Sequence, residues 1–172
     1  MTLITGGSKC GRSAYAERLL DGHGGRKVYI AAMKPYGEEA MTAIKRHRLM
    51  RAGKGFETIE KYTDIHELIL PEKSAVLLEC LPNLLANEMF GESFITDPSD
   101  KIISGIKKIN SMTQRLVVVT GELGCDGGEY SLETGQYIKI LAKINRIIAM
   151  LSDNVVECVY GLPYALKGRT EI

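Results

Sequence analysis

The sequence has no tryptophan, no long hydrophobic run and no excess of charge of either sign. Without tryptophan, the case for a carbohydrate-binding platform is weak. The longest apolar run is Val28–Met33, far short of the roughly 20 residues that span a bilayer, so we expect no transmembrane helix. Lysine and arginine total 22 against 21 acidic residues. The net charge of +1 gives no global attraction to nucleic acid or to an anionic membrane, and we expect neither partner.

Cysteine is sparse, and its spacing suggests no paired site. The cysteines at positions 10, 80, 125 and 158 include no C-x-x-C pair, which argues against a zinc ribbon and against a thioredoxin-type redox site. The start of the chain lacks the basic segment and cleavage site of a secretory signal. We therefore expect free thiols and a cytoplasmic protein.

Length and composition are those of an ordinary globular protein. The chain has 172 residues, of which 45% are hydrophobic and 25% are charged. This length fits one domain, because domains run to roughly 100–200 residues. With no internal repeat, low-complexity tract or linker in the sequence, we predict a single domain over residues 1–172.

Apolar segments of strand length alternate with segments of helix length. The expected strands are Thr2–Thr5, Lys27–Ala32, Phe56–Lys61, Ala75–Glu79, Leu116–Thr120 and Val155–Tyr160. The expected helices are Ser13–Leu20, Glu38–Met50, Asp64–Leu70, Leu84–Phe90, Ser99–Met112 and Leu132–Leu151. In the second helix we expect Met41 and Ile44 to face inward, with Leu49 as a further candidate. Apolar strands separated by helices predict an α/β fold, with a mostly parallel sheet and helices on both faces.

A glycine-rich loop follows the first expected strand. Gly6-Gly7-Ser8-Lys9-Cys10-Gly11-Arg12-Ser13 fits the P-loop pattern G-x-x-x-x-G-K-[ST], except that arginine replaces the lysine. In this pattern the curled backbone presents N–H groups to phosphate oxygens, and the Ser13 hydroxyl is placed to ligate Mg²⁺. Arg12 keeps the positive charge but has a broader, planar head. The alternative is a plain strand-to-helix turn without a ligand.

Acidic residues end two other expected strands. Glu79 closes Ala75–Glu79, where P-loop enzymes hold their metal directly or through water. Glu122 follows the strand that ends at Thr120, where it could position a metal or a substrate hydroxyl. The alternative for both is a carboxylate that faces solvent.

His47 lies among the cations of Lys45-Arg46-His47-Arg48. Neighbouring positive charges favour the neutral imidazole, which is a nucleophile and could attack the α-phosphorus of a nucleotide. A solvated basic face is the alternative interpretation. We interpret His23 and His66 as structural.

Taken together, these residues resemble the adenosylcobinamide kinase / adenosylcobinamide-phosphate guanylyltransferase family over nearly the whole chain. The segments that carry the resemblance are Thr5–Ser13, Val28–Ala32, Arg46–Arg48, Glu57–Glu60, Leu77–Leu81, Val118–Gly124, Ile144–Arg146 and Gly161–Pro163. Their order and spacing are specific. The sequence departs from the family at Arg12, in place of lysine, and at Gly121, in place of a polar residue. It also departs at Pro82 and in the loop at 125–130.

The resemblance implies a bifunctional enzyme of cobalamin assembly with a P-loop NTPase-type, RecA-like fold. One activity phosphorylates adenosylcobinamide from ATP or GTP. The other transfers GMP from GTP to the product through a guanylylated histidine, at the position of His47. The nucleotide would be bound by Gly6, Gly7, Ser8, Lys9, Cys10, Gly11, Arg12, Ser13, Glu60 and Glu79.

The resemblance also implies that Ser13 and Glu79 hold Mg²⁺, that Arg12 assists transfer, and that the protein is a homotrimer with shared sites. Two rival hypotheses follow from the departures. The chain could be a family descendant that retains nucleotide binding as a sensor without catalysis. It could also be a P-loop kinase for another small molecule, which would form no histidine adduct.

Overall fold

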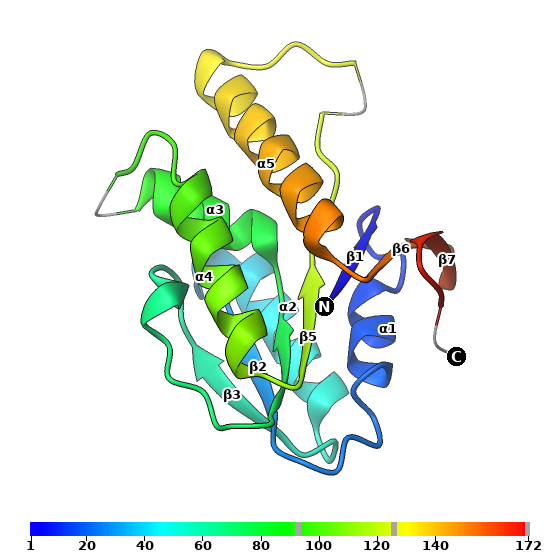
Figure 1. Cartoon of the computed structure of the whole chain (residues 1–172). Helices are drawn as coiled ribbons and strands as arrows, with labels where there is room; N and C mark the ends of the chain where they lie inside the picture. The colour runs from blue at the N-terminus through cyan, green and yellow to red at the C-terminus, as the bar shows by residue number, and fades with distance from the viewer. Residues whose placement is uncertain (92–93, 125–126, 171–172) are drawn as a thin grey trace.

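The computed structural model describes residues 1–91, 94–124 and 127–170. Strands and helices alternate along the chain, as the sequence predicts (Figure 1). The strands are β1 (Thr2–Gly6), β2 (Lys27–Ala31), β3 (Phe56–Glu60), β4 (Ala75–Leu78), β5 (Arg115–Val119), β6 (Asn154–Val159) and β7 (Leu162–Lys167). The helices are α1 (Arg12–Arg18), α2 (Gly37–Arg51), α3 (Leu81–Phe90), α4 (Ser99–Met112) and α5 (Leu132–Leu151), with a 3₁₀ turn η1 (Ile65–Glu67).

The strands form one seven-stranded sheet in the order β3-β2-β4-β5-β1-β6-β7. Every pairing is parallel except that of β6 with β7. The prediction of a mostly parallel α/β sheet is therefore confirmed. Because β1, β2, β4 and β5 run the same way, the residues that follow them meet at one edge of the sheet, where α/β proteins bind their ligands.

Strand β7 is absent from the sequence-based prediction. It pairs with β6 through a tight turn at Tyr160 and Gly161, which have φ angles of 50° and 82°. Two consecutive positive φ angles are those of a type I′ hairpin turn. Pro163 lowers the expectation of a strand, but proline is tolerated at a sheet edge, which is where β7 lies.

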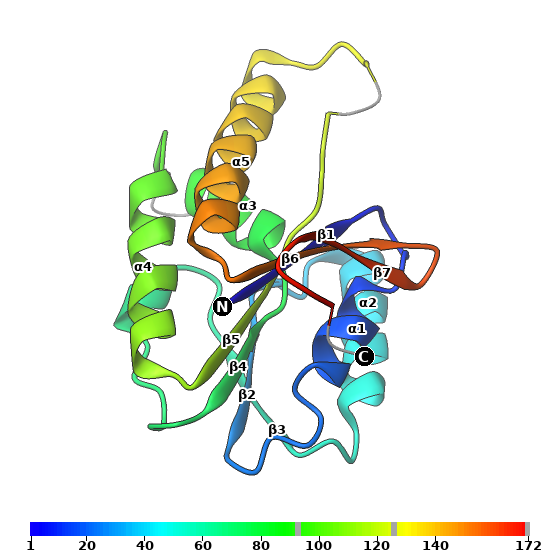
Figure 2. The same cartoon turned by 45° about the vertical axis from the view of Figure 1, so that its right-hand side comes forward.

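Helices cover both faces of the sheet: α3, α4 and α5 lie on one side, and α1 and α2 on the other (Figure 2). Alternate residues of each strand face the two sides, so that Leu3 belongs to the larger apolar cluster and Ile4 to the smaller one. Both faces of the central strands are thus buried, which explains their unbroken apolar sequences. In the described part of the chain, no helix combines the length and apolarity needed to cross a membrane.

Two local predictions are wrong. The helix expected over 64–70 is only the short turn η1, because Asp64 has a left-handed φ of 53° and its side chain makes no capping hydrogen bond. In α2, Met41 and Leu49 are 45% and 76% exposed, and only Ile44 is partly buried. Helix α2 therefore leaves part of its apolar surface in solvent.

Charged side chains hold α2 to the rest of the molecule. Just beyond its end, the Lys54 ammonium donates to Glu17 of α1 at 2.8 Å, and the Glu17 side chain is fully buried. The Arg51 guanidinium lies over the ring of Tyr29 on β2, 3.3 Å from the ring centroid. Such a cation–π contact is strengthened when it is removed from water, and Arg51 is buried.

We predict that Lys54→Ala lowers the free energy of unfolding by about 2 kcal/mol, because it leaves the buried Glu17 carboxylate without its cation. Lys61→Ala is the matched control, since Lys61 pairs with the exposed Glu67 and should cost less than about 1 kcal/mol. Urea unfolding followed by circular dichroism measures both. Equal losses in the two variants would contradict the assigned role of the Glu17–Lys54 pair.

Candidate active site

The loop Gly6–Gly11 connects the end of β1 to α1 and needs glycine at both ends. Gly6 and Gly11 have φ angles of 136° and 98°, which L side chains rarely adopt. A Cβ atom at Gly6 would clash with the carbonyl oxygen of Cys158, and one at Gly11 would come within 3.1 Å of the Cα of Gly161. The Gly161 N–H also donates to the Cys10 carbonyl at 2.9 Å. The β6–β7 turn therefore holds the curled loop from behind.

The loop lines a cavity of about 640 Å³ at the carboxyl edge of the sheet. Other walls come from α2, from the residues that follow β4, and from those that follow β5. The sequence-predicted residues brought together here are Gly6, Ser8, Lys9, Cys10, Gly11, Arg12, Ser13, His47, Glu79 and Glu122. Gly7 belongs to the same loop and is exposed. His23 and His66 line neither this cavity nor the adjacent one described below.

Arg12 is the first residue of α1, and its Nη1 donates to the carbonyl oxygen of Thr120, the residue that follows β5. The backbone N–H of Thr120 donates to Ile4 of β1 at 2.8 Å. The cation of the loop is therefore tied to the edge of the sheet.

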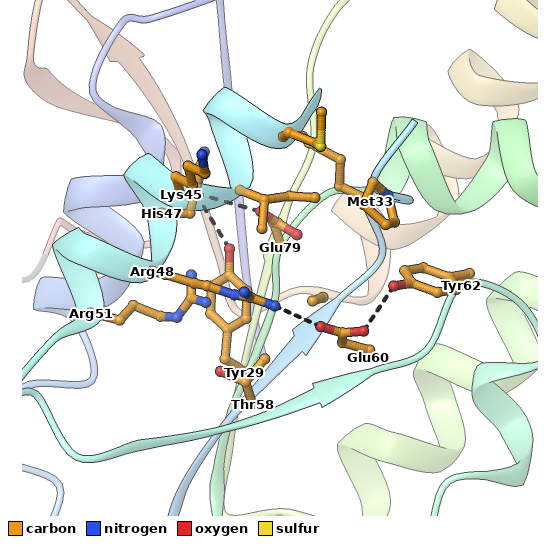
Figure 3. A pocket seen from close by; sticks show the side chains of 14 residues that line it. Tyr29, Met33, Lys45, His47, Arg48, Arg51, Thr58, Glu60, Tyr62 and Glu79 are labelled. Carbon is orange, nitrogen blue, oxygen red and sulfur yellow. Dashed lines mark hydrogen bonds and ion pairs between the residues drawn. The ribbon is translucent and has the colours of Figure 1, made fainter. Parts of the chain in front are cut away.

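His47 meets a tyrosine and a carboxylate on the inner side of α2. Its Nδ1 lies 3.5 Å from Oε1 of Glu79 and 3.4 Å from the hydroxyl of Tyr29 (Figure 3). The His47 and Glu79 side chains are only 12% and 5% exposed. With Nδ1 turned toward these partners, Nε2 is the imidazole nitrogen left for chemistry.

The surroundings favour a neutral imidazole. Burial, followed by the nearby charges of Arg46 and Arg51, lowers the pKa of His47, and the opposing attraction of Glu79 does not reverse this. Burial, together with Glu79, raises the pKa of the Tyr29 hydroxyl well above its usual range. Tyr29 is therefore neutral near neutral pH and can donate to Glu79. Nδ1 of His47 can then carry the ring proton, so that Nε2 keeps the lone pair of a nucleophile.

A second, smaller cavity of about 220 Å³ lies on the β3 side of α2. Glu60 lines it, accepting from Arg48 and from the Tyr62 hydroxyl at 2.9 Å each (Figure 3). His47 and Glu79 line both cavities. The structure thus separates Glu60 from the glycine loop but places it beside the same histidine.

Oxygen ligands suited to Mg²⁺ are present near the loop. The Ser13 hydroxyl and Glu79 line the same cavity, and hard oxygen donors of this kind are those that Mg²⁺ prefers. Glu79 Oε2 is buried and has no hydrogen-bond partner among the described residues. Burying an unpaired carboxylate oxygen is costly, so this atom fits a site that a cation completes.

Sequence patterns gave no role at this site to the side chains of Tyr29 and Asn145, and they counted Arg51 only among the cations around His47. Tyr29 looks like an ordinary member of a buried strand, although a phenol in such a strand needs a polar partner. Arg51 is one of several cations on α2, and only its burial sets it apart. Asn145 of α5 accepts from Thr120 at 2.7 Å and donates to the Gly121 carbonyl at 3.2 Å.

Comparisons with known proteins find relatives over nearly the whole chain. The family model for cobinamide kinase / cobinamide phosphate guanyltransferase matches residues 2–166. The bifunctional adenosylcobalamin biosynthesis protein CobU of Escherichia coli is 28% identical over 182 residues, covering 97% of this chain and 99% of that protein. The protein CobP of Pseudomonas aeruginosa, named for the same process, is 26% identical over 174 residues, covering 96% of each.

Among solved structures, one described as an ATPase domain superposes with a TM-score of 0.47 at 8% identity, covering 91% of this chain and 68% of that one. A superposition with so low a TM-score supports no assignment, so the family assignment depends on the sequence match. That match confirms the resemblance and the expectation of a transferase of cobalamin biosynthesis. The chain therefore belongs to the cobinamide kinase / cobinamide phosphate guanyltransferase family.

Proposed function

We propose that the chain is a single-domain, cytoplasmic enzyme that phosphorylates adenosylcobinamide from ATP or GTP and then transfers GMP from GTP to the resulting phosphate through His47. The observation that carries the proposal is the position of His47, whose buried neutral imidazole lines the same cavity as the glycine loop. A nucleotide held by the loop would lie beside a nitrogen nucleophile.

In the proposed transfer, His47 Nε2 attacks the α-phosphorus of GTP. A nitrogen–phosphorus bond forms as the bond to pyrophosphate breaks, and pyrophosphate leaves. A phosphate oxygen of adenosylcobinamide phosphate then attacks the same phosphorus and releases neutral histidine. The Glu79 carboxylate and the Tyr29 hydroxyl fix the ring at Nδ1, and the carboxylate stabilises positive charge that develops on the ring.

Phosphate binding is assigned to the amides of Gly6–Gly11, to Arg12 and to Ser13, with Lys9 and Cys10 in the same loop. Ser13 and Oε2 of Glu79 would hold Mg²⁺, which when bound offsets the charge of the phosphates. Glu60 faces the adjacent cavity, where its carboxylate could accept hydrogen bonds from a nucleotide base. The kinase step then depends mainly on positioning and charge neutralisation.

We predict that His47→Ala abolishes covalent labelling by α-³²P-GTP while GTP binding persists, because only the nucleophile is removed. His23→Ala is the matched control and should label like the unaltered protein. Labelled protein should also lose its label when adenosylcobinamide phosphate is added. Undiminished labelling of His47→Ala would remove His47 from the mechanism. GTP binding without any label in the unaltered protein would favour the sensor hypothesis.

Tyr29→Phe should slow labelling about tenfold, because it removes one hydrogen bond at His47 and Glu79. The ring that packs under Arg51 remains, so GTP affinity and thermal stability should change little. Rapid-quench measurement of the labelling rate tests this. A rate equal to that of the unaltered protein would show that the hydroxyl has no positioning role.

We further propose that the protein is a homotrimer. Support comes from the apolar side chains exposed on the edge strand β7 and the turn before it, which are Tyr160, Leu162, Tyr164 and Leu166 at 96%, 71%, 66% and 55% exposure. Exposed apolar groups on an open sheet edge are a common basis for association.

Light scattering should therefore give three times the 18.9 kDa mass of the chain. Leu162→Glu should shift the protein toward monomer, because it places a charge within the exposed apolar surface. Lys107→Glu, an exposed change on α4, is the control, because α4 lies on the opposite side of the molecule from β7 (Figure 2). A monomer at high protein concentration would contradict the trimer proposal.

A further inference from the structure

Gly121, the second residue beyond β5, has a role that the proposed function leaves open. A Cβ atom at this position would lie 2.5 Å from Nη1, 3.5 Å from Cζ and 3.7 Å from Nη2 of Arg12. These are its three nearest neighbours, so the space beside Gly121 is filled by one guanidinium group.

The backbone does not require glycine here. Gly121 is not among the glycines with a positive φ angle, so an L side chain could adopt its conformation without strain. The atoms that a Cβ would approach most closely belong to the far end of a flexible side chain. A methyl group at 121 would therefore displace the guanidinium while leaving the fold in place.

The Thr120–Gly121 peptide, against which the guanidinium lies, is held by hydrogen bonds on two sides. The Thr120 carbonyl accepts from Arg12, and the Thr120 N–H is bound to β1. On the other side, Asn145 binds both the Thr120 hydroxyl and the Gly121 carbonyl. The Thr120–Gly121 peptide therefore cannot turn freely, and its acceptor faces Arg12.

We propose that Gly121 is a positioning residue for Arg12. Because Gly121 has no side chain, the guanidinium can lie against the Thr120 carbonyl, in a position from which it can also bind phosphate. The consequence for phosphate rests on the proposed nucleotide function. Arginine has five N–H donors, so a bond to one carbonyl is compatible with others to phosphate. The hydrogen bond to Thr120 also restricts the long Arg12 side chain before the nucleotide binds, which lowers the conformational entropy lost on binding. A lysine at position 12 would have a slimmer head and would not need the space.

The position of the Arg12 guanidinium on the Thr120 carbonyl is tested first in the nucleotide-free protein. With ¹⁵N-labelled arginine, the Arg12 guanidinium signals are assigned by their loss in Arg12→Lys. If the guanidinium is held on the Thr120 carbonyl, these signals should report slow rotation of the group and slow exchange of its protons with water. Gly121→Ala should convert them to fast rotation and exchange, with a melting temperature close to that of the unaltered protein. Unchanged Arg12 signals in Gly121→Ala would overturn the proposal.

The consequence for phosphate is tested by calorimetry with Mg²⁺ and GTP. Gly121→Ala should weaken GTP binding about tenfold when residue 12 is arginine, and by less than about twofold in the Arg12→Lys background. Gly24→Ala is the matched control, because a Cβ atom at Gly24 meets nothing within 4 Å among the described residues.

Equal weakening in the two backgrounds, or tighter binding in Gly121→Ala, would overturn the positioning role. If no variant bound GTP, the nucleotide-binding function would fail, and the arginine signals of the free protein would still decide whether Gly121 seats Arg12.

Discussion

The buried contact between His47 of α2 and Glu79 after β4 determines where the proposed chemistry can occur. Helix α2 keeps Met41 and Leu49 in solvent, so apolar packing alone does not fix its position. Directional contacts do so instead: the imidazole against a carboxylate, Arg51 over an aromatic ring, and Lys54 on a buried glutamate. These contacts are shielded from water, which strengthens them and makes them sensitive to the loss of one partner.

The same carboxylate joins the two proposed chemistries. One oxygen of Glu79 lies 3.5 Å from Nδ1 of His47, and the other is buried without a hydrogen-bond partner among the described residues. If Mg²⁺ binds the second oxygen, as proposed, the carboxylate would serve the histidine and the metal at once, with one oxygen for each.

Arg12 and Gly121, which the sequence analysis gives as separate departures from the family pattern, lie side by side in the structure. They lie far apart in the sequence, yet the guanidinium of one occupies the space that a side chain at the other would fill. An arginine in the loop would clash with a larger residue at 121, whereas with glycine it gains an acceptor in the Thr120 carbonyl. In the proposed arrangement, the arginine at position 12 depends on the sheet edge as well as on the loop.

The sequence by itself determined the parallel sheet, the glycine loop after β1 and the acidic residue after β4, because burial on two faces and tight backbone turns leave local patterns. It could not predict β7, the exposed face of α2 or the short turn η1, since these depend on the sheet edge, on charged anchors and on one left-handed residue. Only the tertiary structure decided that Tyr29 meets His47, that Glu60 faces a separate cavity and that Gly121 makes room for Arg12. Each is a contact between segments distant in the chain, and side-chain proximity of that kind has no local sequence signal.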